Sequence, residues 1–454
     1  MLLTAPAAAH YRRDLGNGLL LRWSTTSDSE NIAHLAGLVF RHKEDEPPDA
    51  RTMQDVRQLM SDRHPFMSSG DFALVEDIHK EGNPLVACAC LWRHRWEYEG
   101  IPFAIGRPEI VASDPAYRHR GLIRALFELL HARSAAEGHL LQGITGIPYY
   151  YRQFGYEYAL EFEGKRIIPL QCIPPAQGDE CEAYQLRPAT VEDVPSLLTF
   201  YHQRRTENAV YTLLPASYWQ YIIEQPPEQR QAGIHMIIDR DGAAQGYILA
   251  SAVIRSQELT VFSMEVAAGT NLLALLPPVL RALQAHGSQL PVRAPEHGPY
   301  KQIELRLQAK HPLYKALDKN LTPISQAPYA WYIRIPNLTG FIQHIAPALE
   351  QRLARSVVAG YTGELRLDFY RGGLSLDFQQ GRLAAVEPWK APIYSPNPGA
   401  RIPALTFLKL LLGYRSLDEL CHAFPDVIVG GEAAIVLNAL FPRRPSQVED
   451  LPIG

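Results

Sequence analysis

Three arginines surround one glycine in a short turn, and their types and spacing allow the binding of an anion. The turn follows an apolar stretch that breaks at Pro115. Apolar residues then recur at helical spacing from Leu122 towards Gly138, which predicts a helix closed by a left-handed glycine. Unpaired N–H groups and the helix dipole favour a pyrophosphate at such a helix start, although composition alone equally allows a solvated basic face. The charged turn consists of Arg118, Arg120, Gly121 and Arg124.

A cluster of tyrosines follows about thirty residues later, in the run Tyr-Tyr-Tyr-Arg-Gln-Phe-Gly-Tyr-Glu over residues 149–157. A phenol has an unperturbed pKa of about 10 and can donate a proton to a leaving group. The residues alone favour stacked packing side chains as the interpretation of these tyrosines.

Together the two segments resemble motifs A and B of the GCN5-related N-acetyltransferases (GNAT). The family's turn has the form Arg/Gln-x-x-Gly-x-Gly/Ala; Arg118 and Gly121 fill its first and fourth places, and Ile123 replaces the last small residue. A large aliphatic residue there is similar to the enhanced intracellular survival (Eis) branch. The resemblance implies an α/β (α+β) fold with tandem GNAT domains, the second degenerate, followed by a sterol-carrier-protein-like α+β domain.

The resemblance also implies the site. Two parallel strands, over residues 103–112 and 141–145, are expected to splay apart and to admit the pantetheine chain of acetyl-CoA, the co-substrate. Tyr151 takes the place of the family's general acid. The terminal carboxylate, on Gly454, is expected to act as the base; Glu449, Asp450 or water are alternatives, as is an inert tail. The expected donor contacts are Val111, Ala112, Ser113, Arg118, His119, Arg120, Gly121, Leu122 and Arg124.

Composition sets limits that are independent of any family. The 454 residues suffice for about three domains, and 46% hydrophobic with 20% charged residues is ordinary for globular cores. A net charge of −4 gives no basic field, so neither nucleic acid nor an anionic membrane is expected as a partner. No apolar run is long enough for a membrane span, and we expect a cytoplasmic protein.

The five cysteines are too scattered for a disulfide framework. Cys88 and Cys90 alternate in an apolar run, which predicts two small core residues on one face of a strand. No Cys or His spacing is typical of a metal site, so no metal is expected.

The chain order predicts three parts: an N-terminal catalytic GNAT domain (1–170), a degenerate GNAT-like domain (182–320) and a sterol-carrier-like domain (328–454) whose tail reaches the active site. The first part is expected to contain a strand at 19–23, a helix at 30–40 and a hairpin of 72–77 with 85–96. The second part restarts a strand and helix, with Thr190 as N-cap and Asp193 at the third helical position. Its counterpart of the anion turn has Gly269 but no arginine, so no coenzyme A is expected there.

The predicted reaction is direct transfer of an acetyl group from acetyl-CoA to a primary amine, without a covalent intermediate. The resemblance implies aminoglycoside-like cations or lysine and peptide amines as acceptors, and homo-oligomers, commonly hexamers. Acids at 44–46 and Asp49 either attract a polycation or form a solvated loop. A longer acyl-CoA is an alternative donor. A non-catalytic lipid-carrier or scaffold protein with a GNAT shape is the alternative function. The apolar residues of the C-terminal part are more simply explained by its own core and by an oligomer or interdomain contact than by lipid binding.

Overall fold

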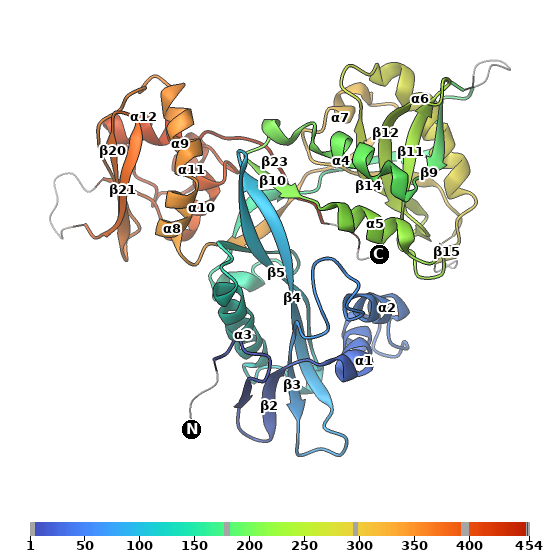
Figure 1. Ribbon diagram of the computed structural model, residues 1–454, viewed down its shortest axis with the longest axis horizontal. Coiled ribbons are helices and arrows are strands. Elements are labelled where there is room, and N and C mark those ends of the chain that lie inside the picture. The colour runs from blue at the N-terminus through green and yellow to red at the C-terminus, as the bar shows by residue number, and fades with distance from the viewer. Residues whose placement is uncertain (1–4, 177–181, 294–297, 392–398, 451, 453–454) are drawn as a thin grey trace.

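The computed structural model describes residues 5–176, 182–293, 298–391, 399–450 and 452. Figure 1 shows three lobes joined by one long hairpin. Each lobe contains one β-sheet, with ten, nine and four strands respectively. The expectation of a mixed α/β fold is therefore confirmed. No helix in these ranges combines the length and the apolar character that crossing a membrane requires.

The ten-stranded sheet belongs to the first lobe. Its main order is β1-β2-β3-β4-β5-β6-β18-β7, and β10 pairs with β4 and β23 outside that path. Neighbours are antiparallel from β1 to β5, whereas β5 and β6 are parallel. The strands are β1 (Arg12–Asp14), β2 (Leu19–Trp23), β3 (Phe72–Asp77), β4 (Leu85–Tyr98), β5 (Ile101–Ser113), β6 (Leu141–Ile144), β7 (Glu157–Phe162), β10 (Val210–Leu213), β18 (Tyr329–Arg334) and β23 (Ser446–Gln447).

Helices cover both faces of this sheet because side chains along β4 alternate between two apolar cores. Cys88 and Cys90 pack with α1 (Ser29–Phe40) and α2 (Ala50–Leu59), and both are fully buried, as the alternation predicts. Ala87 and Leu91 instead pack against α3 (Leu122–Ala136). The expected strand 19–23 is observed exactly, and the first helix and hairpin differ from their expected ranges by at most two residues.

The nine-stranded sheet forms the second lobe, shown in green and yellow in Figure 1. Its strands are β8 (Lys165–Pro169), β9 (Tyr184–Pro188), β11 (Ala232–Asp239), β12 (Ala244–Ser251), β13 (Ile254–Arg255), β14 (Glu258–Val266), β15 (Val292–Arg293), β16 (Gln302–Arg306) and β17 (Ile324–Gln326). Its helices are α4 (Val194–His202), α5 (Ala216–Glu224), α6 (Leu272–Gly287) and α7 (Leu313–Ala316).

The openings of the first two lobes share one ion pair at the same spacing. Arg22 donates two hydrogen bonds of 2.8 Å to Asp28, and Arg187 donates two of 2.7 Å to Asp193. Each aspartate also accepts from the backbone N–H three residues earlier, at Thr25 or at Thr190. The shared strand–turn–helix contacts are what a duplicated opening would produce, and they support tandem units.

The four-stranded sheet lies in the C-terminal lobe, with β19 (Gly363–Asp368), β20 (Gly373–Gln379), β21 (Arg382–Trp389) and β22 (Ala400–Arg401). Five helices accompany it: α8 (Leu338–His344), α9 (Ala346–Ala354), α10 (Ala404–Leu411), α11 (Leu417–Ala423) and α12 (Gly431–Leu440). Helix α10 buries Phe407 and Leu410 completely, as its apolar density predicts. The likeness to a sterol carrier stays a prediction.

Strands are shared between the three expected parts. β8 lies in the second sheet although its residues belong to the expected first part, and β18 lies between β6 and β7 in the first sheet although it follows residue 328. β10 and β23 extend the first sheet from the other two parts. The expected division of the chain into parts 1–170, 182–320 and 328–454 therefore stays a prediction. In the structure, strands from one part join the sheet of another.

Candidate functional site

A cavity of about 680 Å³ opens where α3 begins, and the anion turn forms one wall. Gly121 is the N-cap of α3 with φ of +75°, and His119 has φ of +63°. Glycine adopts this left-handed conformation without a steric penalty, and no side chain caps the helix. The first N–H groups of α3 thus have no intrahelical partner and no capping side chain, which leaves them for an anion.

The second lobe lacks this arrangement at the corresponding helix. Asn271 caps α6, and its side-chain oxygen accepts from the N–H groups of Leu273 and Ala274. The helix start is therefore already satisfied, and no arginine stands in the preceding turn. This difference supports the expectation that the second unit binds no coenzyme A.

The parallel strands beside the turn separate along their length. β5 and β6 pair only at Ile105 with Leu141 and at Gly106 with Gln142. Beyond Gly106, β5 pairs with β4 alone, so its other edge is not part of a ladder with β6. This is the splay that the resemblance to GNAT proteins implies, and a chain with amide groups could pair with that edge.

A β-bulge lies near the end of β5, next to residues that line the cavity. The register with β4 shifts between Cys88 and Cys90, where β5 has one extra residue. Ile110 there has φ of +47°, which is rare for a β-branched side chain. Such strain persists where surrounding structure enforces it and is concentrated at functional sites.

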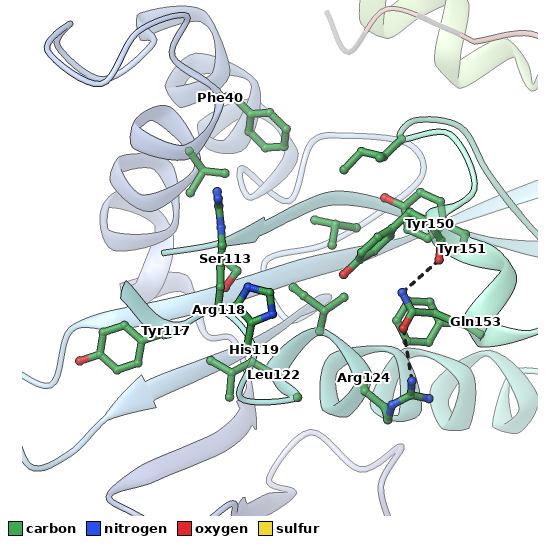
Figure 2. A pocket seen from close by; sticks show the side chains of 16 residues that line it. Phe40, Ser113, Tyr117, Arg118, His119, Leu122, Arg124, Tyr150, Tyr151 and Gln153 are labelled. Carbon is green, nitrogen blue, oxygen red and sulfur yellow. Dashed lines mark hydrogen bonds between the residues drawn. The ribbon is translucent and has the colours of Figure 1, made fainter. Parts of the chain in front are cut away.

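The two predicted motifs meet across the cavity. Figure 2 shows Arg118 and His119 on one side and Tyr150, Tyr151 and Gln153 on the other. Arg124 donates a hydrogen bond of 3.3 Å to Gln153, whose amide donates to the Tyr150 carbonyl at 3.1 Å. Phe127 of α3 stacks on Phe154, with ring centroids 4.6 Å apart. These contacts fix α3 to the short 3₁₀ helix η3 (Tyr150–Phe154).

Tyr151 lies in the wall of this cavity and is 4% exposed. Burial, the charge of Glu109 and the neighbouring Tyr150 raise the pKa of its phenol well above the usual value. The phenol therefore carries its proton throughout the physiological pH range. A protonated phenol beside a donor site can supply a proton to a leaving thiolate.

Most of the residues predicted to contact acetyl-CoA line this one cavity. Two do not line the cavity: Ala112 is buried on the sheet face towards α1, and the Arg120 guanidinium lies 4.7 Å from the Tyr117 ring centroid. The expectation for Gly454 falls outside the described residues. The predicted residues that line the cavity are Val111, Ser113, Arg118, His119, Gly121, Leu122, Arg124 and Tyr151.

A second, smaller cavity of about 260 Å³ adjoins the first. Phe40 lines both cavities, and Figure 2 shows its side chain in the wall of the larger one. Ile110, at the bulge, lines the smaller cavity, and Val111 lines the larger one. The remaining lining residues of the smaller cavity are Arg51, Thr52, Asp55, Trp92, Arg107, Glu109, Asp450 and Pro452.

An ion-paired cluster connects this smaller cavity to the C-terminal tail. Arg107 donates to Glu109 at 2.7 Å and forms an ion pair with Asp450. Its guanidinium lies 5.1 and 4.7 Å from the ring centroids of Trp92 and Trp331. Burial raises the pKa of the Glu109 carboxyl above its usual range, although Arg107 opposes this shift.

Our sequence interpretation missed Glu109 and Arg107. The available signal is a pair of charges inside an otherwise apolar run, Arg107-Pro108-Glu109-Ile110-Val111. Charges are rarely buried unless they are paired, so such a pair marks either an ion-pair network or a site. Their partner Asp450 is 343 residues from Arg107 and cannot be found from local pattern.

Asp55 adds a third carboxylate to the smaller cavity. Burial raises its pKa to about 7, and its ion-pair partner Arg51 lies 3.7 Å away. Gln231 of the second lobe donates to the same carboxylate. The wall thus holds Asp55, Glu109 and Asp450 against Arg51 and Arg107, an excess of carboxylates when all are ionised.

The tail reaches this place along a defined path. β23 pairs in parallel with β10, and Glu449 beyond it accepts from Gln308 at 3.0 Å and Gln447 at 3.1 Å. Pro452 lines the smaller cavity, and its carbonyl accepts from the Tyr218 hydroxyl at 3.3 Å. The described end of the chain is therefore ordered beside the first lobe's site. Among the described residues, no group of three or more His, Cys, Asp or Glu side chains is arranged to hold a metal.

Comparison with known proteins agrees with this geometry. Residues 21–159 match the family model of the acetyltransferase (GNAT) domain. This range includes β2 to β6, the anion turn and Tyr151. No curated protein matches the chain in sequence.

Solved structures match nearly the whole chain. A probable N-acyltransferase from Enterococcus faecalis V583 is 13% identical, with a TM-score of 0.64 over 95% of this chain and 99% of that one. A GCN5-related N-acetyltransferase from Kribbella flavida is 18% identical, with a TM-score of 0.60 over 95% and 99%. Eis1 from Mycobacterium abscessus is 14% identical, with a TM-score of 0.57 over 94% and 99%.

Residues 21–159 of the first lobe are therefore a GNAT acetyltransferase domain, and the presence of this domain supports an acetyltransferase enzyme. Nearly the whole chain is similar in fold to Eis1, so the expected resemblance to Eis-like GNAT proteins is confirmed by the family model for the domain and by this likeness for the fold.

Proposed function

We propose that the protein is an acetyl-CoA-dependent N-acetyltransferase that modifies primary amines of cationic molecules. The observation that carries this proposal is the meeting of the uncapped turn at Gly121, the unpaired edge of β5 and Tyr151 around one cavity. The pyrophosphate of acetyl-CoA would contact the turn at Gly121, its pantetheine chain the edge of β5, and its thioester Tyr151. The residues fit such a donor because the turn supplies N–H groups and arginines without a nearby carboxylate in the cavity wall.

The reaction is a direct displacement. The amine nitrogen forms a bond to the thioester carbonyl carbon, the C–S bond breaks, and the thiolate takes a proton from the Tyr151 hydroxyl. The acceptor ammonium first gives one proton to solvent, and the neutral amine then attacks. Once the bond has formed, the nitrogen loses a second proton to a carboxylate, and that proton later restores the Tyr151 phenol. Glu109 is the described carboxylate best suited to this role, because it adjoins the bulge where the cavities meet and its charge influences the Tyr151 pKa. The terminal carboxylate of Gly454 stays a second candidate, supported by the path of the tail up to Pro452.

The acceptor is proposed to enter through the smaller cavity. Its excess of carboxylates, with Asp55 contributed by α2 and Asp450 by the C-terminal tail, favours a positively charged amine. Aminoglycoside-like molecules and lysine or peptide amines both have this character. We further propose that the protein is a cytoplasmic homo-oligomer, commonly a hexamer, on the basis of its resemblance to Eis proteins.

The test is titration calorimetry of the full chain with acetyl-CoA, followed by an amine screen that detects the free thiol of coenzyme A. We expect one donor site per chain, because only the first unit has the uncapped turn. Thiol release that depends on the amine would establish the transfer. Absence of donor binding would overturn the proposal and favour the lipid-carrier or scaffold alternative.

A further inference from the structure

A cavity of about 750 Å³ lies where all three lobes meet, far along the β4–β5 hairpin from the donor site. β5 ends at Ser113 in the donor cavity and begins beside Gly100 in this one. We refer to it as the junction cavity. Its charged lining residues are Glu97, Glu99, Arg205, Arg352, Arg355 and Arg444.

The charges of the junction cavity do not balance. Arg205 donates to both carboxylate oxygens of Glu97, at 2.5 and 2.6 Å. Glu99 accepts from two guanidiniums, those of Arg352 at 3.0 Å and of Arg444. Arg355 has no carboxylate partner among the described residues. The wall therefore carries two more positive than negative charges.

Arg352 is the buried member of this set, with a side chain that is 8% exposed. Its Nη1 donates to the Tyr98 hydroxyl at 2.8 Å and to the Leu440 carbonyl, and its Nε donates to Glu99. Its Nη2 has no partner within the described ranges. A buried guanidinium donor that is left unpaired is costly, and native sites usually provide a partner for it.

We propose that the junction cavity binds an oxyanion with two or more negative charges, of the phosphate class. Guanidinium groups pair with such oxygens through charge-assisted hydrogen bonds, and the cavity wall contains the exposed charge of Arg355 beside Arg352, whose buried Nη2 has no partner within the described ranges. Gln351 and Asn438 add neutral donors to the wall. The bound anion would join the C-terminal lobe to the hairpin that leads to the donor site.

The experiment measures binding of inorganic phosphate by equilibrium dialysis at constant ionic strength. The full chain with the Gly121→Asp substitution is used, because this change removes phosphate binding at the donor turn. We expect one site per chain, and Arg355→Gln should weaken it by about tenfold or more. Arg382→Gln is the control and should leave affinity unchanged, because the Arg382 side chain is exposed and does not line the junction cavity.

Three outcomes would overturn the proposal. These are no phosphate bound by the Gly121→Asp protein, equal affinity in the Arg355→Gln protein, and equal loss in the Arg382→Gln protein. Arg352→Gln is a second variant that should abolish binding. If it fails to fold, Arg355→Gln still decides, because that side chain is exposed. Acetyl-CoA binding by the unsubstituted chain is measured separately, so failure of this proposal is distinct from failure of the proposed function.

Discussion

The Arg107 guanidinium forms an ion pair with Asp450, which joins the sheet of the acetyltransferase domain to the C-terminal tail. Arg107 is almost fully buried and also holds Glu109, whereas about a third of the Asp450 side chain is exposed. The tail is thus part of the wall of the smaller cavity, through which we propose that the acceptor enters. Its contribution can be measured separately from donor binding.

Replacing Asp450 by Asn should impair the use of the amine and leave the donor site intact. The tail loses its ion pair, and the cavity loses one of its carboxylates. We expect KM for the amine to rise by about tenfold, with a stability loss of about 1 kcal/mol because the pair is partly exposed. Steady-state kinetics and acetyl-CoA calorimetry give the two readouts. An unchanged KM would exclude the tail from acceptor binding. Glu364→Gln, an exposed change on β19, is the control.

Gly121→Asp should weaken acetyl-CoA binding. The substitution adds the conformational cost of a left-handed residue, about 1 kcal/mol, and places a negative charge at the helix start that would hold the pyrophosphate. Gly138→Asp is a matched control, because Gly138 lies after the other end of α3 with φ of +73° and equally open surroundings. Calorimetry should show a loss of affinity in the first variant only. Equal affinities would exclude the turn as the donor cradle.

Tyr151→Phe should reduce turnover by about a hundredfold or more, as expected for loss of a general acid, with little change in donor affinity. Tyr149→Phe is the control, because Tyr149 is adjacent in sequence but 72% exposed and outside the cavity. Rates of thiol release under saturating substrates provide the measurement. Equal turnover of the Tyr151→Phe and unsubstituted proteins would exclude the proton transfer.

Sequence patterns predicted the local parts of this architecture well. The strand at 19–23, the helix that begins at Leu122 and the left-handed Gly138 follow from periodicity and glycine placement. The resemblance of two segments to GNAT motifs also predicted that they lie in one site. Arg124 of the first segment and Gln153 of the second are hydrogen-bonded to each other.

Contacts between distant parts of the chain were not predictable in the same way. β18 enters the first sheet by pairing with β6 and β7, although its own sequence is that of any short apolar strand. The cluster of Glu109, Arg107 and Asp450 forms only when the tail docks. Local propensity contains no information on which strand or charge becomes the partner.

Glu449 should make stability depend on pH. Burial and the nearby Glu265 raise its pKa from 4.5 to about 7. Because the folded pKa lies above the unfolded value, the stabilisation is complete at pH below 4.5 and is lost as pH rises through 7. The loss for this group is about 3 kcal/mol. Denaturant unfolding at pH 5 and pH 8 should show a smaller difference for Glu449→Gln than for the unsubstituted chain. Glu364→Gln should keep the full difference, and an identical pH dependence in all three would contradict the assignment.

Phe40 should limit the length of the acyl group, because it is the one residue that lines both the larger and the smaller cavity. Phe40→Ala would join the two volumes, and each buried CH₂ of a longer acyl chain then contributes about 0.8 kcal/mol, or about fourfold in affinity. The ratio of kcat/KM for butyryl-CoA over acetyl-CoA should therefore rise by about tenfold. Val39→Ala is the control, because Val39 lines the larger cavity but not the smaller one. Since Phe40 is 46% exposed, Tm should change little, and an equal ratio in both variants would show that the acyl group ends elsewhere.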